Sequence, residues 1–239
     1  MENRSTLAAL ILGGFICAGL IGLGYLLSSG AVRFKTLDRS VTVKGLSERE
    51  VAATVAIWPI RFSEADNDLA GLVTAVQRKT ALIIEFLKDN GFSGDEISIS
   101  PPAIIDRQAQ GYVDAGKVPF RYTATVAVSL YTGKVEAVRG AMAKLVELGK
   151  QGIAISGEDY QSRTEFLFTE LNSIKPAMIE EATENARQVA EKFAQDSSSR
   201  LGKIRRAQQG QFSISDRDSN TPYIKKVRVV STLEYYLSD

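Results

Sequence analysis

The sequence contains no histidine, and its only cysteine, Cys17, lies inside an apolar run near the N-terminus. Histidine is the most common general base near neutral pH and the most common metal ligand in proteins, so either kind of site would need other residues here. One cysteine in an apolar segment supplies neither a disulfide framework nor a thiolate site to the rest of the chain. A cysteine-free polar part is compatible with an oxidising compartment.

Signatures of phosphate binding, zinc binding and nucleophilic catalysis are also lacking. The chain has no glycine-rich phosphate loop, no zinc-ligand spacing and no nucleophile elbow. Its 29 lysines and arginines almost balance its 28 aspartates and glutamates, so no net field favours nucleic acid. We therefore expect a protein without enzymatic activity, without a cofactor or metal, and without a nucleic-acid partner.

One long apolar run is present, at residues 7–27 (LAALILGGFICAGLIGLGYLL). It is uncharged and about as long as a helix needs to cross a bilayer, so we predict a transmembrane anchor in contact with lipid. The alternative is a cleaved signal peptide, since Ser29 and Ala31 suit a small-residue cleavage site. The length of the run favours the anchor. The predicted division of the chain is a tail, an anchor, a linker and one α+β domain, at residues 1–6, 7–27, 28–39 and 40–239.

Small residues recur at every fourth position within this run, at Gly14, Ala18 and Gly22. They share one helical face, on which two anchors could pack closely and form a homo-oligomer. Glycine is also common in single membrane-spanning helices, so the alternative is that these residues mark no contact between anchors.

The charges that flank the run disagree about orientation. Arg4 is the only basic residue before it, whereas Arg33, Lys35, Arg39 and Lys44 follow it. The positive-inside rule alone places the C-terminal part in the cytoplasm. The very short N-terminal tail is typical of a signal anchor, and we predict that the domain lies on the outer side.

The longest predicted helix of the domain covers residues 172–201. Asn172 or Ser173 can cap it, Pro176 is expected in its first turn, and Gly202 is expected to stop it. Its apolar side chains recur at three- and four-residue spacing and form one stripe: Met178, Ala182, Ala186, Val189, Ala190 and Phe193.

Two shorter helices are predicted at residues 66–90 and 133–148. Asp66 or Asn67 can cap the first, and Gly149 is expected to stop the second. The strands are predicted from alternating apolar residues, at 51–62, 96–106, 121–131, 152–160, 164–169, 204–215 and 225–237.

The order of these elements suggests an internal repeat of the form strand–helix–strand–strand. The first copy begins with the strand 51–62, and the second begins with the strand 164–169. Helices against a largely antiparallel sheet make an α+β fold, here with about three helices covering the sheet.

Several segments resemble the SIMPL-domain family, whose bacterial members include the YggE-like envelope proteins. They are Val41, Val43 and Gly45, the strand VAATVAIW, the run from Phe166 to Gly202, and the closing VRVVSTLEYYL. The resemblance covers about residues 40–238, and none of its motifs is a catalytic signature. Leu46 departs from it, since many members carry a second glycine in this turn.

The resemblance implies an α+β envelope domain. It would place the protein in the bacterial inner membrane as a single-pass protein with its domain in the periplasm, or in secreted form after cleavage. Ring-like or channel-like assembly and a link to oxidative-stress defence are further implications, and there are no family catalytic residues to carry over.

Carboxylates in the two long loops are the weak ligand candidates of the sequence: Asp106, Asp216 and Asp218. Such groups can bind a hard cation or serve in acid–base chemistry, although solvated loop charge is the plainer interpretation.

A basic cluster follows the longest helix, at Arg200, Lys203, Arg205 and Arg206. It could contact anionic lipid or a partner's carboxylates, or simply be a solvated helix end. Of the adjacent Tyr235 and Tyr236, one should be buried because neighbours on a strand face opposite ways.

Two functions remain open at this stage. The first is a structural or interaction module that self-associates through strand edges and loops. The second is a small-ligand or hydrolytic domain that uses the loop carboxylates. The missing catalytic residues favour the first.

Overall fold

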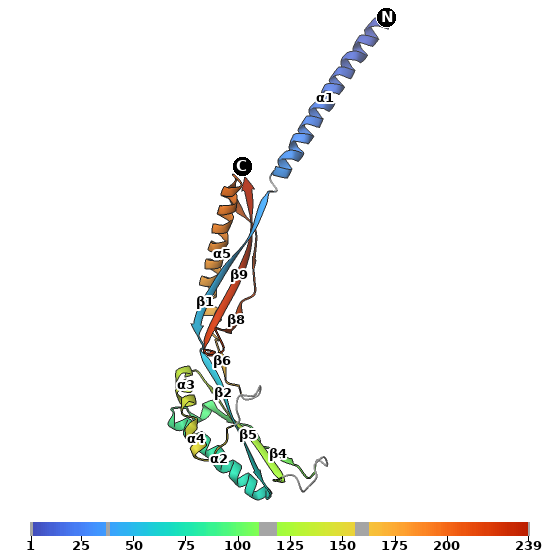
Figure 1. Cartoon of the computed structure of the whole chain (residues 1–239). Coiled ribbons are helices and arrows are strands. Elements are labelled where there is room, and N and C mark those ends of the chain that lie inside the picture. The colour runs from blue at the N-terminus through green and yellow to red at the C-terminus, as the bar shows by residue number, and fades with distance from the viewer. Residues whose placement is uncertain (1, 37–38, 110–118, 156–162, 239) are drawn as a thin grey trace. The chain divides into compact units, whose positions relative to one another are not determined.

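A computed structural model describes residues 2–36, 39–109, 119–155 and 163–238. It confirms an α+β fold of antiparallel sheets and helices that follows an apolar N-terminal helix (Figure 1). The helices are α1 (Glu2–Thr36), α2 (Leu69–Asp89), α3 (Val135–Ala143), α4 (Val146–Lys150) and α5 (Leu171–Asp196), with a short 3-10 turn η1 (Gly94–Glu96). The strands are β1 (Ser40–Ala52), β2 (Val55–Asp66), β3 (Ile97–Ile99), β4 (Ala103–Asp106), β5 (Tyr122–Thr132), β6 (Glu165–Leu167), β7 (Arg200–Gln209), β8 (Ser213–Asp216) and β9 (Ile224–Ser238).

The chain divides into two compact units. The terminal unit comprises Met1–Glu48, Ile174–Ser213 and Arg228–Asp239, and the middle unit comprises Arg49–Ser173 and Ile214–Val227. Each unit has its own sheet and its own cluster of buried side chains.

The sheet of the middle unit has the order β3-β5-β2-β6, and β4 also pairs with β5. The strands β2 and β5 pair over their whole length, from Ala56 opposite Thr132 to Asp66 opposite Tyr122. Alternate residues of each point to one face and are buried there: Trp58, Ile60 and Phe62 from β2, and Val126, Val128 and Leu130 from β5. This alternation of buried and exposed residues is what the sequence predicts for the segment 121–131.

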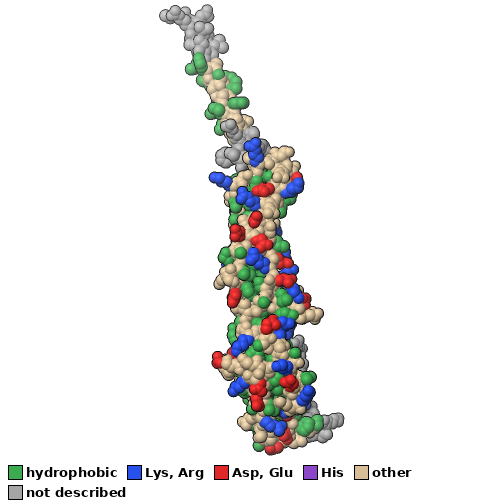
Figure 2. Space-filling model, turned by 90° about the vertical axis from the view of Figure 1, so that its left-hand side faces the viewer, with side chains coloured by type: hydrophobic (Ala, Val, Ile, Leu, Met, Phe, Trp, Pro, Cys, Tyr) green, Lys and Arg blue, Asp and Glu red, His purple; other side chains and the backbone are tan. Residues whose placement is uncertain are grey.

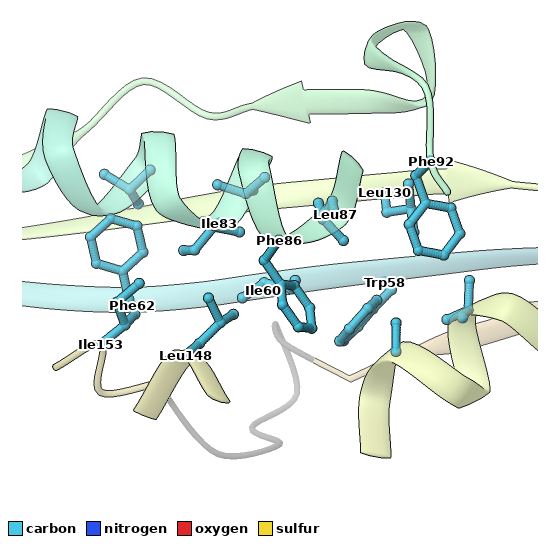
Figure 3. Close-up of a cluster of buried hydrophobic side chains, with 14 of the residues drawn as sticks. Trp58, Ile60, Phe62, Ile83, Phe86, Leu87, Phe92, Leu130, Leu148 and Ile153 are labelled. Carbon is cyan, nitrogen blue, oxygen red and sulfur yellow. The ribbon is translucent and has the colours of Figure 1, made fainter. Parts of the chain in front are cut away.

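Helix α2 covers this apolar face. Figure 3 shows Ile83 and Leu87 of α2 beside Ile60 and Trp58 of β2, in a cluster that also holds Leu148. Fully burying side chains of this size stabilises the fold by about 1.5–3 kcal/mol each. The buried cluster of the middle unit has many more members than that of the terminal unit, so the middle unit has the larger apolar core.

The ends of α2 are set by local hydrogen bonds. The Asp68 carboxylate accepts from the backbone N–H of Gly71 at 2.7 Å, so Asp68 caps the helix. The prediction that Asp66 or Asn67 is the cap is wrong. Asp66 instead accepts from the backbone N–H groups of the two residues that follow it. Gly91 takes a φ of 89° after the helix, which a glycine adopts without steric cost.

The predicted helix 133–148 is interrupted. Helix α3 ends at Ala143 and α4 begins at Val146, and the backbone turns between them. Gly149 lies inside α4, and Gly152, with a φ of 78°, takes the left-handed position instead. Of the predicted strand 152–160, Ile155 forms a single bridge to Phe62, and residues 156–160 lie outside the described part.

The sheet of the terminal unit has the order β1-β9-β7, and β8 also pairs with β9. Helix α5 packs on this sheet through residues that recur at every fourth position and are all buried: Met178, Ala182, Ala186, Ala190 and Ala194. The prediction that Val189 and Phe193 belong to this stripe is wrong, because both are exposed. The four-residue row already faces the sheet, and residues one position before it lie about 100° away around the helix.

Helix α5 is shorter than predicted. It ends at Asp196 rather than Leu201, and Ser198 takes the left-handed φ of 54° in the turn that follows. Gly202, expected as the stop, lies within β7. The helix also begins earlier than its caps suggested, so Pro176 lies beyond the first turn, where its ring removes one intrahelical hydrogen bond.

The strand–helix–strand–strand order does occur twice, with one strand reassigned. The first copy is β2, α2, β3 with β4, and β5, all in the middle unit. The second copy is β1, α5, β7 with β8, and β9, and most of β8 and the start of β9 belong to the middle unit. In both sheets the last of these strands pairs with the first and with the third. The predicted first strand of the second copy, 164–169, contains β6, which pairs with β2 instead.

Candidate functional site

Helix α1 contains one segment, Leu12–Gly30, that is long and apolar enough to cross a membrane. Its described side chains are exposed, and Figure 2 shows no charged group along it. A signal sequence at the N-terminus would have the same length and composition. A Cβ atom built on Gly14 or Gly22 would meet nothing within 4 Å, so the small-residue face, which includes Ala18, is open in the single chain.

Asp106, at the end of β4, is held by Arg121. The guanidinium donates from Nη2 at 2.9 Å and from Nε at 3.2 Å to the same carboxylate oxygen. The hydrogen bond from Arg121 lowers the pKa of Asp106 below its ordinary value, and the backbone N–H of Gln108 also donates to it at 3.0 Å. This carboxylate is therefore engaged in closing its own hairpin.

Asp218 organises the turn between β8 and β9. It accepts from the backbone N–H groups of Asn220 and Thr221, each at 2.8 Å, and from the Thr221 hydroxyl. Arg217 Nε donates to it at 3.1 Å. These hydrogen bonds, above all that from Thr221, lower the pKa of Asp218 to about 2.

Asp216 lies beside a cavity. Its carboxylate forms an ion pair with Lys225, a lysine that is only 8% exposed, and Arg163 lies 3.9 Å away. The cavity has a volume of about 350 Å³ and is lined by Arg163, Thr164, Glu165, Phe166, Leu167, Asp216, Pro222 and Lys225. Its two basic and two acidic residues balance, so it has no evident preference for an anion or a cation.

The structure gives each of the three carboxylates its own cationic or backbone donors. Asp216 and Asp218 are two residues apart, yet they bind different partners, and Asp106 is engaged with Arg121. In the ranges that the structure describes, no three His, Cys, Asp or Glu residues are grouped as metal ligands. The arrangement is one that stabilises loops, and it holds none of the carboxylates ready as a general base.

The sequence did not point to two hollows on either side of α5, both inside the terminal unit. The first, which we call the α5–β7 groove, has a volume of about 730 Å³. It is lined by Glu180, Thr183, Glu184 and Arg187 of α5, by Gly202, Lys203 and Ile204 of β7, and by Tyr235 of β9. Tyr235 is the buried member of the tyrosine pair, and burial raises the pKa of its hydroxyl.

The β7 side of this groove continues the inner face of the sheet. Ile204 lies opposite Tyr235, and Ala207 lies opposite Leu233, so each points to the same face as its neighbour on β9. Yet Ile204 is 47% exposed, whereas Tyr235 is 3% exposed.

Ile204 is exposed because α5 is too narrow to cover all three strands of the sheet. The buried cluster joins Ala186 and Ala190 of α5 to Val43 of β1 and to Leu233 and Tyr235 of β9. A helix about 10 Å across spans about two strands spaced 4.8 Å apart, and so it leaves a third strand uncovered.

The opposite flank of α5, which we call the α5–β1 hollow, is also apolar. It has a volume of about 620 Å³ and is lined by Asn185, Gln188, Val189, Lys192, Phe193 and Asp196. Phe193 is 54% exposed and Val189 is 41% exposed. Asn185 Nδ2 donates to the carbonyl oxygen of Leu46 at 2.8 Å, which places this flank on the β1 side.

A comparison with protein families finds one match. The model of the SIMPL family, described as a protein of unknown function (DUF541), matches residues 41–232. No curated protein matches the chain. The matched range contains every strand and helix of both units except α1, the first residue of β1 and residues 233–238 of β9. On the strength of that coverage, the chain belongs to the SIMPL family.

Proposed function

We propose that this protein is a membrane-anchored periplasmic module without enzymatic activity, which self-associates through the two flanks of α5. The anchor is the apolar run in α1, and the associating part is the terminal unit. The observation that carries the proposal is the uncovered apolar face of β7, because its residues are in register with buried core residues of β9.

Strand β7 is suited to receive a further strand. It lies at the end of the described strand order β1-β9-β7, and almost all of its residues are exposed. An edge strand of this length offers a row of backbone N–H and C=O groups to any extended segment that approaches it. Soluble proteins usually protect such an edge, and pairing with another copy is one way to do so.

A second copy of the chain is the proposed occupant because the opposite flank has the matching chemistry. The α5–β1 hollow presents Val189 and Phe193 beside the other edge strand of the same sheet. If this flank of one copy covers the α5–β7 groove of the next, both apolar surfaces are removed from water. Anchoring in one membrane also raises the effective concentration of the copies.

This contact joins two different surfaces, so it is heterologous. Heterologous contacts close into rings or extend into filaments, depending on the rotation between neighbours. The open face of Gly14, Ala18 and Gly22 would add a contact between anchors.

The test is the mass of the full-length protein in detergent, measured by light scattering. We expect a discrete oligomer for the natural chain and monomers for Ile204→Lys, which breaks the groove, and for Phe193→Asp, which breaks the opposite flank. Val146→Asp is the matched control, since Val146 is an exposed apolar residue of α4 in the middle unit. A natural chain that stays monomeric at high concentration contradicts the proposal.

Mixing the two variants tests the heterologous geometry. The Ile204→Lys copy retains an intact α5–β1 hollow, and the Phe193→Asp copy retains an intact groove. Their mixture should give dimers with one contact, whereas a symmetric contact of groove with groove would leave the mixture monomeric.

A role in envelope or oxidative-stress defence would follow from the family resemblance, and we propose it on that basis. Peroxide sensitivity of a deletion strain, restored by the natural chain but not by Ile204→Lys, would tie the role to assembly. Loss of the role in the triple variant Asp106→Ala, Asp216→Ala and Asp218→Ala would instead favour a ligand-binding or hydrolytic function.

A further inference from the structure

The cavity beside Asp216 runs along the edge of a strand of the middle unit. One wall is made by five consecutive residues, 163–167, which include the whole of β6. Successive side chains of a strand point to opposite faces, so a hollow on one face would be lined by alternate residues. A hollow lined by every residue in turn lies along the strand edge. This edge is open in the described part of the chain, where β6 pairs with β2 on one side and with no strand on the other.

Both walls of the cavity are held in place by the rest of the middle unit. On the β6 side, Phe166 is buried and packs edge-on against the ring of Tyr223, with the ring centroids 6.2 Å apart. The backbone N–H of Thr54 donates to the carbonyl oxygen of Leu167 at 2.7 Å. On the opposite side, the wall is made by Asp216, Pro222 and Lys225, from β8, β9 and the turn between them. The cavity is therefore formed before anything binds, which lowers the cost of binding.

The size and the backbone groups of this edge suit a short extended peptide. An end strand directs a row of N–H and C=O groups away from its neighbour, and an extended peptide can pair with them as a further strand. In a sheet, one residue occupies about 3.3 Å by 4.8 Å by 10 Å, roughly 160 Å³. The cavity volume of about 350 Å³ therefore corresponds to about two residues.

Two cationic side chains in the lining have hydrogen-bond donors to spare. Lys225 is 8% exposed and its ammonium carries three N–H donors, yet Asp216 is its one partner among the described residues. The guanidinium of Arg163 lies 3.9 Å from Asp216, which is beyond hydrogen-bond distance. Buried donors are normally satisfied, so these two side chains favour an acceptor such as a carboxylate in the cavity.

An acidic side chain lies farther along the same wall. Glu165 is exposed, and no ion pair to it occurs among the residues that the structure describes. It is two residues from Arg163, so the two positions are about 7 Å apart along the strand. An extended dipeptide has about the same length between its ammonium and its carboxylate. Leu167 and Pro222 add apolar surface for a side chain.

We propose that this cavity binds free peptides of about two residues, extended and antiparallel to β6. The carboxylate of the peptide accepts from Arg163 and Lys225, and its ammonium pairs with Glu165. The linking peptide group bonds to the open edge of β6. A zwitterion of this kind matches a lining whose two basic and two acidic residues balance. The site is separate from the proposed self-association, which uses the terminal unit.

A free short peptide is favoured over an internal segment of a partner protein. The cavity holds about two residues and has a charged side chain suited to each terminus of a peptide. A segment inside a longer chain has no terminal charges to match them, and it would have to continue beyond both ends of the cavity.

The experiment is calorimetric titration of the full-length protein in detergent with the dipeptide alanyl-leucine. We expect saturable binding, and binding at least about tenfold weaker for the same dipeptide acetylated and amidated, because both terminal charges are then absent. At saturation with alanyl-leucine, hydrogen exchange in the peptide that contains residues 163–167 should slow, because the added strand covers the open edge of β6.

Single substitutions identify the residues. Arg163→Gln and Glu165→Gln should each weaken binding about tenfold, and both residues are exposed, so the fold is retained. Arg78→Gln is the matched control, since Arg78 is an exposed residue of α2 that does not line the cavity, and its affinity should equal that of the natural chain.

Three results would overturn the proposal. The first is the absence of both heat and protection with the dipeptide at about 10 mM. The second is an unchanged affinity in Arg163→Gln and Glu165→Gln. The third is equal affinity for the blocked dipeptide, which would assign the edge of β6 to an internal segment of a partner protein instead. None of these results bears on self-association, whose test is the mass of the protein.

Discussion

Gly45 of β1 lies directly against the backbone of Ala182 in α5. A Cβ atom built on Gly45 would be 1.8 Å from the carbonyl oxygen of Ala182, and 2.5 Å from the backbone nitrogen of Ala186. Because these neighbours are backbone atoms of a helix, they cannot move aside as a flexible side chain would. The alanine stripe of α5 and this glycine together allow helix and strand to approach closely.

Substituting Gly45 by alanine should therefore destabilise the terminal unit by about 3 kcal/mol or more, at the upper end of the cost of overpacking. Urea unfolding followed by circular dichroism would measure the loss. Gly140→Ala is the matched control, since a Cβ there meets nothing within 4 Å and the residue lies inside α3. The control should gain about 0.5–1 kcal/mol from the better helix propensity of alanine. Equal stability of the two variants would contradict the close packing.

This contact also shows what the sequence could and could not predict. The alanine spacing of α5 is visible in the sequence, and so are Val41, Val43 and Gly45 at alternate positions of β1, although no strand is predicted there. That Gly45 and Ala182 meet is not visible, because well over a hundred residues of the middle unit separate β1 from α5 along the chain. For the same reason, sequence order alone predicts the segment 164–169, which contains β6, as the first strand of the second repeat.

The two flanks of α5 were missed for a related reason. The periodicity of the sequence predicts that Val189 and Phe193 belong to the buried stripe, because apolar residues at three- and four-residue spacing usually share a buried face. Their exposure depends on how many strands one helix covers, which is a property of the assembled sheet. The signal available in the sequence was the alanine row itself, whose strict four-residue spacing leaves larger apolar residues beside it.

The carboxylates Asp106, Asp216 and Asp218 differ from the sequence interpretation in the other direction, because side chains interpreted as solvated have partners in the structure. The sequence predicts Asp106, Asp216 and Asp218 in loops, whereas Asp106 ends β4, Asp216 ends β8, and only Asp218 lies in a loop. The sequence also could not show that each has a partner nearby in the fold. Lys225 lies on β9, a strand predicted only as an alternating apolar segment, and its burial depends on the ion pair with Asp216.

Asp216→Ala should destabilise the middle unit by about 2 kcal/mol, because it leaves the buried Lys225 ammonium without its carboxylate. The double variant Asp216→Ala with Lys225→Met should recover most of this loss, since no charge then remains buried. A double-mutant cycle in urea measures the coupling between the two residues. Additive losses would show that the pair contributes nothing, and would free Asp216 for a role in ligand binding.

Glu96 should make the stability of the middle unit depend on pH in the acid range. Hydrogen bonds from the Thr132 hydroxyl and from the Ser93 backbone lower the pKa of Glu96 from 4.5 to about 2. A carboxylate with a lowered pKa stabilises the fold above its unfolded pKa, and this contribution is lost as pH falls from about 4.5 towards 2.

Glu96→Gln should abolish this part of the pH dependence. We expect a difference of about 1 kcal/mol between the natural chain and the variant above pH 5, after allowance for solvent screening, and convergence near pH 2. Glu136→Gln is the control, because its pair with Arg139 is largely exposed. Parallel stability curves for the natural chain and Glu96→Gln would contradict the assignment.

The orientation of the anchor decides whether the proposed module lies in the periplasm. In a chain with Cys17→Ser, a new cysteine at Ser219, in the exposed loop between β8 and β9, should react with a membrane-impermeant maleimide in intact spheroplasts. A new cysteine at Ser5, before the apolar run, should react only after lysis. The reverse pattern would mean that the four basic residues after the run set the topology, as the positive-inside rule alone requires. A shortened protein released from the membrane would instead indicate cleavage near Ser29, and would leave the terminal unit without a tether to lipid.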